Sequence, residues 1–201
     1  MEHYRQVIEV FTPEQLAAFM SLLNSELNQI SDWGQALITD EGRVVKEIRD
    51  TDIKQINQSF LSFEILHNKL NQAVQIYGET LQKVYKEAAL AGPVICSPGT
   101  SSRHQALDIL RYTPGQYYTW HVDQCLDNSP DDASHHRTIS VVLYLSDQFE
   151  GGGTEFPDCV FKPKAGEALF FPSSWCYPHR AQQVTQGEKI VCVTWYEVYE
   201  D

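Results

Sequence analysis

The chain has 201 residues, of which 42% are apolar, and a formal net charge of −12 at pH 7. This length and composition predict one soluble globular domain over residues 1–201, large enough to bury a sizeable core. The lack of a basic run argues against a nucleic-acid partner, and no apolar stretch approaches the ~18–20 residues that cross a membrane.

Cysteine use and the first residues of the chain bear on its compartment. The five cysteines are odd in number and include no CxxC pair, so a reducing environment is expected rather than a disulfide framework. The first residues contain no apolar segment typical of a signal peptide. These features predict a cytoplasmic protein, in which Cys192 is a small core residue.

Residues 1–95 are predicted to be a mainly helical support region. Thr12-Pro13-Glu14-Gln15 is a capping box with proline at the first helical position, and apolar residues follow at spacings of three and four. A short strand is expected around Val44-Val45. A second helix is expected from about Ile53 to Ala91, with Gly78 as a candidate point for a bend or break. Both helices should cover the outer face of one sheet.

Residues 96–201 are predicted to form the core of the domain. The sequence pattern here changes to short strands, which we place at 106–112, 116–122, 138–145, 153–156, 159–164, 167–171, 177–184 and 188–198. About eight such strands fit a jelly-roll barrel, so the expected fold class is α+β with helices packed on one sheet. The loops 96–103 and 124–136 are either plain connections or lids over a binding site.

The clearest chemical signal is His121-Val122-Asp123, followed by His179 56 residues after the aspartate and by Lys189 ten residues later. Two imidazoles and one carboxylate are the facial ligand set of non-haem ferrous oxygenases. Such a set leaves three positions of an octahedral iron open, two for a two-oxygen co-substrate and one for dioxygen. Residues two apart on a strand face the same side, so the HxD pair fits a strand. Lys189 supplies a cation suited to the far carboxylate of a dicarboxylic keto acid.

Each part of this signal has a plainer reading. An HxD pair also occurs by chance, with His121 as a hydrogen-bonded loop histidine beside a solvated Asp123. The alternative for Lys189 is that its head group reaches solvent at the end of a strand. Buried lysines are rare unless they are paired. Cys125 is a weaker candidate ligand, because a thiolate favours zinc or copper-like sites.

Neighbouring segments complete a larger pattern. In chain order these segments are Arg111-Tyr-Thr-Pro-Gly-Gln, Arg137-Thr-Ile-Ser-Val-Val-Leu-Tyr, Gly151-Gly-Gly-Thr-Glu-Phe, Pro178-His179 and Gly187-Glu-Lys-Ile-Val. In this order and spacing, residues 104–198 resemble the prolyl 4-hydroxylase-like branch of the 2-oxoglutarate- and iron(II)-dependent dioxygenases. The resemblance covers about half of the chain and includes no motif in residues 1–95.

This resemblance implies a double-stranded β-helix and a role for each motif residue. It implies Fe²⁺ on His121, Asp123 and His179. It implies that Lys189 pairs with the C5 carboxylate of 2-oxoglutarate. It also implies that Tyr112 and Tyr144 assist in binding that carboxylate; the alternative is that both are core aromatics. It implies that Arg137 and Trp195 contact the substrate; the alternative for Arg137 is a surface residue at the start of a strand.

The predicted activity follows from these roles. We expect a hydroxylase that acts on a protein or peptide side chain, above all proline, and that uses O₂ while 2-oxoglutarate is decarboxylated to succinate and CO₂. Ascorbate is the expected reductant. The alternatives are the same chemistry on a free amino acid, a small metabolite or another residue type, or a non-catalytic barrel that binds metal or ligand. Water should be excluded from the site by apolar walls, for which the candidates are Val141, Leu143, Phe170, Val191 and Val193.

Overall fold

The computed structural model describes residues 4–37, 44–87, 107–124 and 137–197. The predicted loop 96–103, Cys125, and all of the loop 124–136 except its first residue therefore lie outside the described residues. Two helices are described, α1 (Pro13–Leu27) and α2 (Leu61–Glu87). Neither helix has a segment that is both long and apolar enough to cross a membrane.

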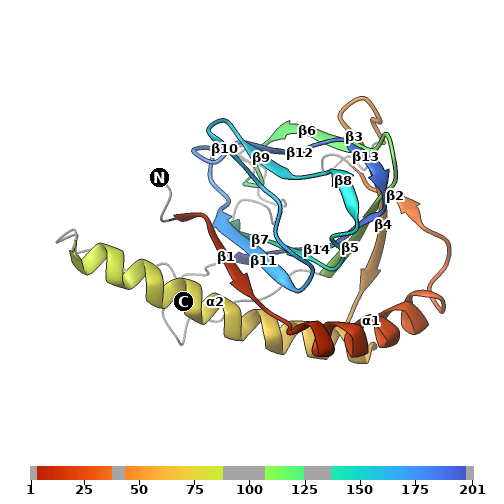
Figure 1. Ribbon diagram of the computed structural model, residues 1–201, viewed down its shortest axis with the longest axis horizontal. Coiled ribbons are helices and arrows are strands. Elements are labelled where there is room, and N and C mark those ends of the chain that lie inside the picture. Colours follow the sequence, from red (N-terminus) through yellow and green to blue (C-terminus); the bar gives the residue numbers. More distant parts are fainter. Residues whose placement is uncertain (1–3, 38–43, 88–106, 125–136, 198–201) are drawn as a thin grey trace.

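Two larger sheets and a two-stranded ribbon form the barrel in the described part of the chain (Figure 1). The seven-stranded sheet contains, in spatial order, β1 (Gln6–Glu9), β11 (Glu167–Pro172), β7 (Arg137–Tyr144), β14 (Lys189–Glu197), β5 (Leu107–Tyr112), β4 (Asp52–Ile56) and β2 (Gly34–Gln35). The five-stranded sheet contains β10 (Cys159–Phe161), β9 (Thr154–Phe156), β12 (His179–Ala181), β6 (Tyr117–His121) and β3 (Arg49–Asp50). The ribbon pairs β13 (Val184–Gly187) with β8 (Phe149–Gly151). This is the predicted α+β jelly-roll architecture.

The C-terminal strands lie close to their predicted positions, with two differences. The predicted strand 177–184 is wrong as one element, because β12 ends at Ala181 and a separate β13 begins at Val184. The split has a physical reason: β12 pairs with β6 and β9 in the five-stranded sheet, whereas β13 leaves that sheet to pair with β8. Strand β8 has only three residues and was not predicted.

The N-terminal half contains more strand than the sequence predicted. The expected strand at Val44-Val45 is wrong, since the strands here are β3 and β4. The expected helix start at Ile53 is also wrong, because Ile53 pairs with Leu110 in the sheet and α2 begins at Leu61. Helix α2 continues through Gly78 without a break.

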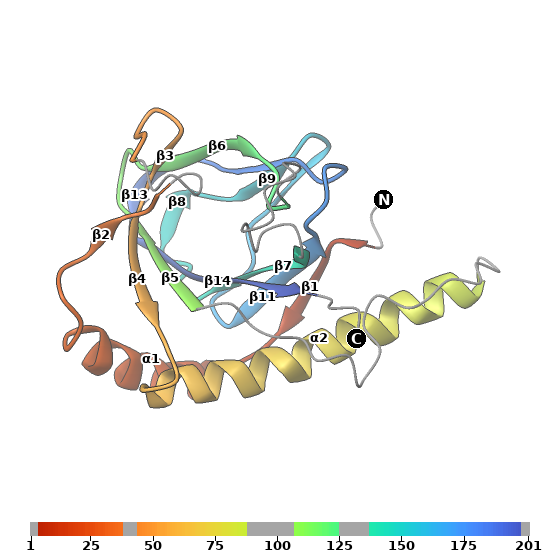
Figure 2. The ribbon, with the colours of Figure 1, turned by 180° about the vertical axis from the view of Figure 1, so that it is seen from behind.

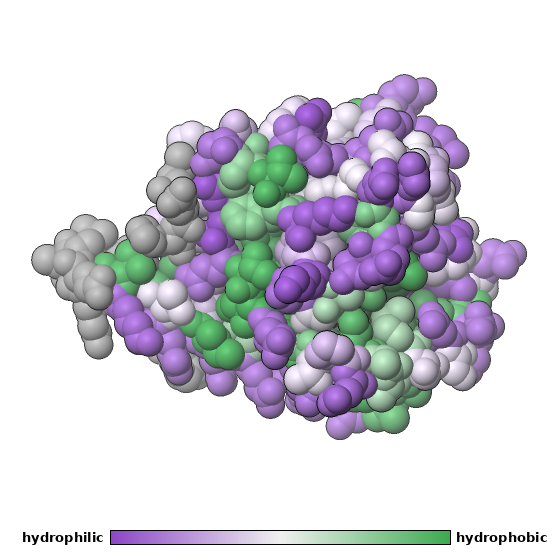
Figure 3. Space-filling model, viewed as in Figure 1, coloured by the Kyte–Doolittle hydropathy of each residue, from purple (hydrophilic) through white to green (hydrophobic). Residues whose placement is uncertain are grey.

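Both helices pack on the outer face of the seven-stranded sheet, as Figures 1 and 2 show from opposite sides. The capping box of α1 is present: the amide of Gln15 donates to Thr12 Oγ1, and the amide of Thr12 donates to Gln15 Oε1, both at 3.3 Å. The buried helix residues that meet the sheet include Leu16, Leu23, Leu66, Leu70 and Tyr77. The face of the molecule shown in Figure 3 has mostly polar residues with smaller apolar areas between them.

Strand alternation divides the sheet residues between two cores. Val141, Leu143 and Phe170 pack against the helices, so their predicted role as walls of the barrel interior is wrong. Cys192 lies in the same helix-facing core, as expected for a small core residue. Val191 and Val193 do face the interior, where the buried residues include Leu110, Val142, Tyr144, Leu169 and Phe171.

One carboxylate joins the two helices. Glu26, near the end of α1, accepts hydrogen bonds from the backbone amides of Leu61 at 3.0 Å and Ser62 at 3.1 Å. These amides belong to the first turn of α2, where they have no partner within the helix. Glu26 therefore caps α2 from another helix, with a negative charge at the positive end of the helix dipole.

Replacement of Glu26 by alanine should lower the free energy of unfolding by about 1–3 kcal/mol, because the backbone amides of Leu61 and Ser62 lose their acceptor. Chemical denaturation measured by circular dichroism tests this. Glu26→Gln should lose less, since one acceptor oxygen remains. Glu79→Ala, at an exposed position within α2, should be nearly neutral, and equal losses in the two alanine variants would contradict the capping role.

Candidate metal centre and co-substrate pocket

Strand pairing brings the three predicted metal ligands together. His121 ends β6 and lies directly opposite His179, which begins β12. The Nε2 atoms of both histidines lie 3.6 Å from a carboxylate oxygen of Asp123. The potential ligand atoms of the three residues lie within 4.8 Å of one another, close enough to bind one metal ion.

Backbone carbonyls set the orientation of both imidazoles. The Nδ1 atom of His121 lies 2.8 Å from the carbonyl oxygen of Thr119, and the Nδ1 atom of His179 lies 3.1 Å from that of Tyr177. A carbonyl only accepts hydrogen bonds, so each Nδ1 donates and each Nε2 keeps its lone pair. This is the tautomer that a metal ligand needs, fixed by a partner outside the metal shell.

The pKa values of the site favour the metal-binding protonation states. Burial lowers the pKa of His179 to about 4, against the opposing effect of Asp123, so this imidazole is neutral at pH 7. Burial by itself would raise the pKa of Asp123, but His179, His121 and the Ser140 hydroxyl together hold it below its ordinary value. An ionised carboxylate and a neutral imidazole are the forms that bind metal.

Arg137 and Trp195 lie together beside the triad. The guanidinium of Arg137 lies 3.7 Å from the centre of the Trp195 ring and donates to the carbonyl oxygen of Asp123 at 3.2 Å. Trp195 is buried, and its indole N–H has no hydrogen-bond acceptor among the described residues. Arg137 thus contacts both Trp195 and the backbone of Asp123, a predicted metal ligand.

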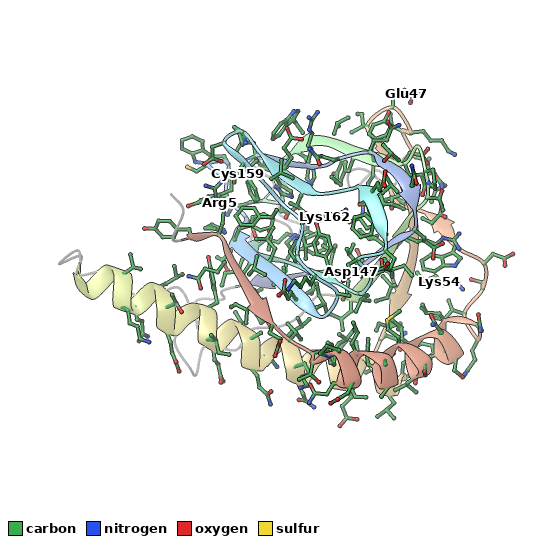
Figure 4. All side chains as sticks on the ribbon, viewed as in Figure 1. Arg5, Glu47, Lys54, Asp147, Cys159 and Lys162 are labelled. Carbon is green, nitrogen blue, oxygen red and sulfur yellow. The ribbon has the colours of Figure 1, made fainter. Side chains whose placement is uncertain are left out.

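Lys189 is the most deeply buried charged side chain of the interior, with 2% of its surface exposed. Its Nζ donates to the carbonyl oxygen of Gly152 at 2.6 Å, and no carboxylate among the described residues pairs with it. Burial, with a smaller contribution from Lys162, lowers the pKa of this ammonium to about 7. Lys162, labelled near β8 in Figure 4, donates to the carbonyl oxygen of Phe149 at 2.6 Å. The reading in which the Lys189 head group reaches solvent does not fit this burial.

Two tyrosines enclose the Lys189 ammonium. Its Nζ lies 4.9 Å from the ring centre of Tyr112 and 5.1 Å from that of Tyr144. Burial raises the pKa of both phenols, so both stay protonated and can donate. The Tyr144 hydroxyl bonds Thr154 Oγ1 at 2.9 Å, and the Tyr112 hydroxyl feels the charge of Asp123. Tyr112 therefore interacts with both Lys189 and Asp123.

Aromatic rings exclude water from both sides of the histidine pair. Phe171 and Phe156 flank His179, with ring centres at 4.7 Å and 5.7 Å. On the other side, Tyr118 stacks on His121 at 3.6 Å, and Arg49 lies over Tyr118 at 4.9 Å. These rings take the place of several aliphatic walls that were expected here.

Several residues of the site were missed by sequence reasoning. Ser140 donates to Asp123 Oδ2 at 2.5 Å, and its own oxygen lies 2.8 Å from that of Ser173. Thr154 and Gly152 belong to the noted segment Gly151-Gly-Gly-Thr-Glu-Phe, which therefore contained a usable signal. Ser140 and Ser173 carry no such signal in the sequence alone, because hydroxyl residues are common on strands.

The sequence of this chain was compared with known protein families and with curated proteins. Residues 107–197 match the model of the 2OG-Fe(II) oxygenase superfamily. A candidate prolyl 4-hydroxylase of Acanthamoeba polyphaga mimivirus is 38% identical over 105 residues, which cover 45% of this chain and 43% of the relative. A PKHD-type hydroxylase of Psychrobacter sp. (strain PRwf-1) is 30% identical over 150 residues, covering 71% of this chain and 51% of the relative. The chain thus spans about half of the length of these relatives.

Solved structures show the same fold. The prolyl hydroxylase of Trichoplax adhaerens, solved in complex with a peptide fragment of the hypoxia-inducible factor oxygen degradation domain, aligns with a TM-score of 0.68 at 15% identity. The alignment covers 98% of this chain and 84% of that one. The family match spans the strands that hold the triad and Lys189, so residues 107–197 of this chain are similar in sequence to the 2OG-Fe(II) oxygenase superfamily.

Proposed function

We propose that this domain is an Fe²⁺- and 2-oxoglutarate-dependent hydroxylase that acts on prolyl residues of a peptide or protein. The observation that supports this most directly is the buried ammonium of Lys189, which has no carboxylate partner among the described residues and shares the barrel interior with a His-Asp-His cluster. A buried charge without a counterion is costly, so the pocket is suited to an anionic ligand.

The residues present fit a ferrous ion. His121, Asp123 and His179 offer two imidazole nitrogens and one carboxylate within a cluster small enough for one ion, with Asp123 ionised and His179 neutral at pH 7. When bound, iron with O₂ and 2-oxoglutarate supplies the oxidising chemistry: the substrate C–H becomes C–OH, and 2-oxoglutarate becomes succinate and CO₂. Ascorbate is the proposed reductant that keeps the iron ferrous.

The protein positions the co-substrate and keeps water out. We propose that Lys189 binds the C5 carboxylate, with the protonated hydroxyls of Tyr112 and Tyr144 available to donate to it. The interior rings around the cluster lower the local dielectric, which strengthens this ion pair. Tyr112 would serve both regions, since its ring lies 4.9 Å from Lys189 Nζ and its hydroxyl feels the charge of Asp123.

The choice of proline rests on the relatives and on the residues beside the triad. The relatives include proteins named as prolyl 4-hydroxylases and PKHD-type hydroxylases, and the Trichoplax enzyme was solved with a peptide. In this chain, the free indole N–H of Trp195 offers a donor to a peptide carbonyl. A proline-rich segment is extended before it binds, so its docking costs little conformational entropy.

Removal of the carboxylate ligand should abolish both metal binding and turnover. Asp123→Ala leaves two imidazoles, and we expect no Fe²⁺- or Co²⁺-dependent heat in anaerobic titration calorimetry and no succinate formation. Asp32→Ala, at an exposed position, should behave as the wild type. Wild-type metal affinity in Asp123→Ala would remove Asp123 from the site.

The affinity for 2-oxoglutarate should fall as the pH rises above 7. Below pH 7 the Lys189 side chain of the ligand-free protein is protonated and carries its charge. Above pH 7 it loses its proton, and binding of a dianionic ligand then requires that Lys189 be protonated again. Between pH 7 and pH 9 the dissociation constant of the metal-loaded protein should rise about 50-fold, as follows from a free-state pKa of about 7. Titration calorimetry at several pH values measures this.

Two variants sharpen this measurement. Lys189→Arg should bind with little dependence on pH over this range, because a guanidinium stays protonated. Lys164→Ala, which removes an exposed lysine, should keep the wild-type profile. A flat profile in the wild type would mean that Lys189 does not bind the co-substrate carboxylate.

A substrate screen distinguishes the proposal from its alternatives. Proline-containing peptides with Fe²⁺, 2-oxoglutarate and ascorbate should gain one oxygen on proline by mass spectrometry, with one succinate per hydroxylation. Hydroxylation of free amino acids with every proline peptide left unchanged would favour the alternative substrate class. No succinate under any condition, despite bound metal, would indicate a non-catalytic barrel.

A further inference from the structure

Two buried hydroxyls form a chain that ends on the Asp123 carboxylate. Ser140, in the middle of β7, lies 2.5 Å from Asp123 Oδ2, and Ser173, just after β11, lies 2.8 Å from Ser140. Both serines are buried, with 0% and 1% of their surface exposed. Their hydroxyls therefore bond each other and the carboxylate rather than bulk water.

The direction of this chain follows from counting protons. A carboxylate that binds metal is ionised and can only accept hydrogen bonds. Ser140 must therefore donate its single proton to Asp123 Oδ2. Ser140 then has no proton left for its other neighbour, so Ser173 donates to the oxygen of Ser140. The chain runs in one direction, from Ser173 through Ser140 to Asp123.

Backbone hydrogen bonds fix the outer end of this chain. The amide of Gln124, the residue after the metal ligand, donates to the Ser173 carbonyl at 3.0 Å. The Ser173 amide donates to the Thr138 carbonyl, also at 3.0 Å. Ser173 thus lies where the Asp123 segment, β7 and the segment that leads to His179 meet, and its backbone is held from two sides.

We propose that Ser140 and Ser173 are positioning residues that make Asp123 a one-oxygen metal ligand, with Oδ2 held by Ser140 and Oδ1 left for the metal. The inference rests on the proposed metal site and adds the residues that define how its carboxylate binds. The chemistry depends on this mode, because a two-oxygen co-substrate and O₂ need three open positions on an octahedral ion. A carboxylate bound through both oxygens would occupy one of them.

Co²⁺ binding to the purified protein tests the proposal without measuring activity. Ser140→Ala should weaken Co²⁺ affinity by about 10–100-fold and change the visible absorption spectrum of the bound ion, because the freed carboxylate can bind through both oxygens. Ser140→Thr retains the hydroxyl and should keep both the affinity and the spectrum. Ser173→Ala should weaken binding less, and the double variant should be no worse than Ser140→Ala, because Ser173 acts through Ser140.

A matched control comes from the same strand. Thr138→Val removes a β7 hydroxyl that donates to the Tyr196 carbonyl at 2.9 Å instead of to a metal ligand, and it should leave the Co²⁺ spectrum unchanged. Thermal unfolding of each metal-free variant shows which remain folded. If Ser140→Ala does not fold, the altered spectrum is still required of Ser173→Ala.

Three results would overturn the inference, and a fourth would leave it standing. Wild-type affinity and spectrum in the serine-to-alanine variants would remove the positioning role, as would an equal loss in Thr138→Val. If the wild type itself does not bind Co²⁺ or Fe²⁺, the proposed metal site fails, and the serine inference fails with it. Absence of peptide hydroxylation by a protein that binds metal normally would contradict only the proposed substrate, and the inference about the serines would stand.

Discussion

The site depends on the register between β6 and β12. His121 and His179 face each other because these strands pair directly at those two residues, and a shift of one residue would turn Arg180 inward and His179 outward. The register is supported from the other side, where β12 pairs with β9. There, Arg180 forms a two-point ion pair with Glu155 at 2.8 and 3.0 Å. A polar contact on the outer face thus helps to fix which side chains reach the interior.

The interior concentrates charges that folding alone would disfavour. Lys189 is buried and only 9% of the Asp123 side chain is exposed, yet the two do not pair with each other among the described contacts. Asp123 accepts a hydrogen bond from the Ser140 hydroxyl, and Lys189 donates to the Gly152 carbonyl. Such an arrangement costs stability, and the helix-facing core on the opposite side of the same sheet offsets that cost. The two-residue alternation of β7 shows the division clearly: Ser140 and Val142 face the site, whereas Val141 and Leu143 face the helices.

The sequence predicted elements with a strong local pattern and missed those that depend on tertiary pairing. The capping box at Thr12 and the long alternating strands were found because their signals are local. Strands such as β3 and β8, two and three residues long, exist only because a partner strand pairs with them. In the site, His121, Asp123, His179 and Lys189 were named from spacing. Ser140 and Ser173 were not, since their role requires knowledge that β7 and the end of β11 meet beside Asp123.

The N-terminal region is more than a cover for the barrel. Strands β1, β2 and β4 extend the seven-stranded sheet, and β1 is tied to the β9–β10 turn by the ion pair of Arg5 with Asp158. Strand β3 extends the opposite sheet and carries Arg49, which lies over the Tyr118 ring that stacks on His121. Thr51 lies beside the Tyr112 hydroxyl. The family match begins only at residue 107, yet one wall of the interior is built from residues before it. Chains that share the catalytic motif can therefore differ in the surroundings of their metal centre through this region alone.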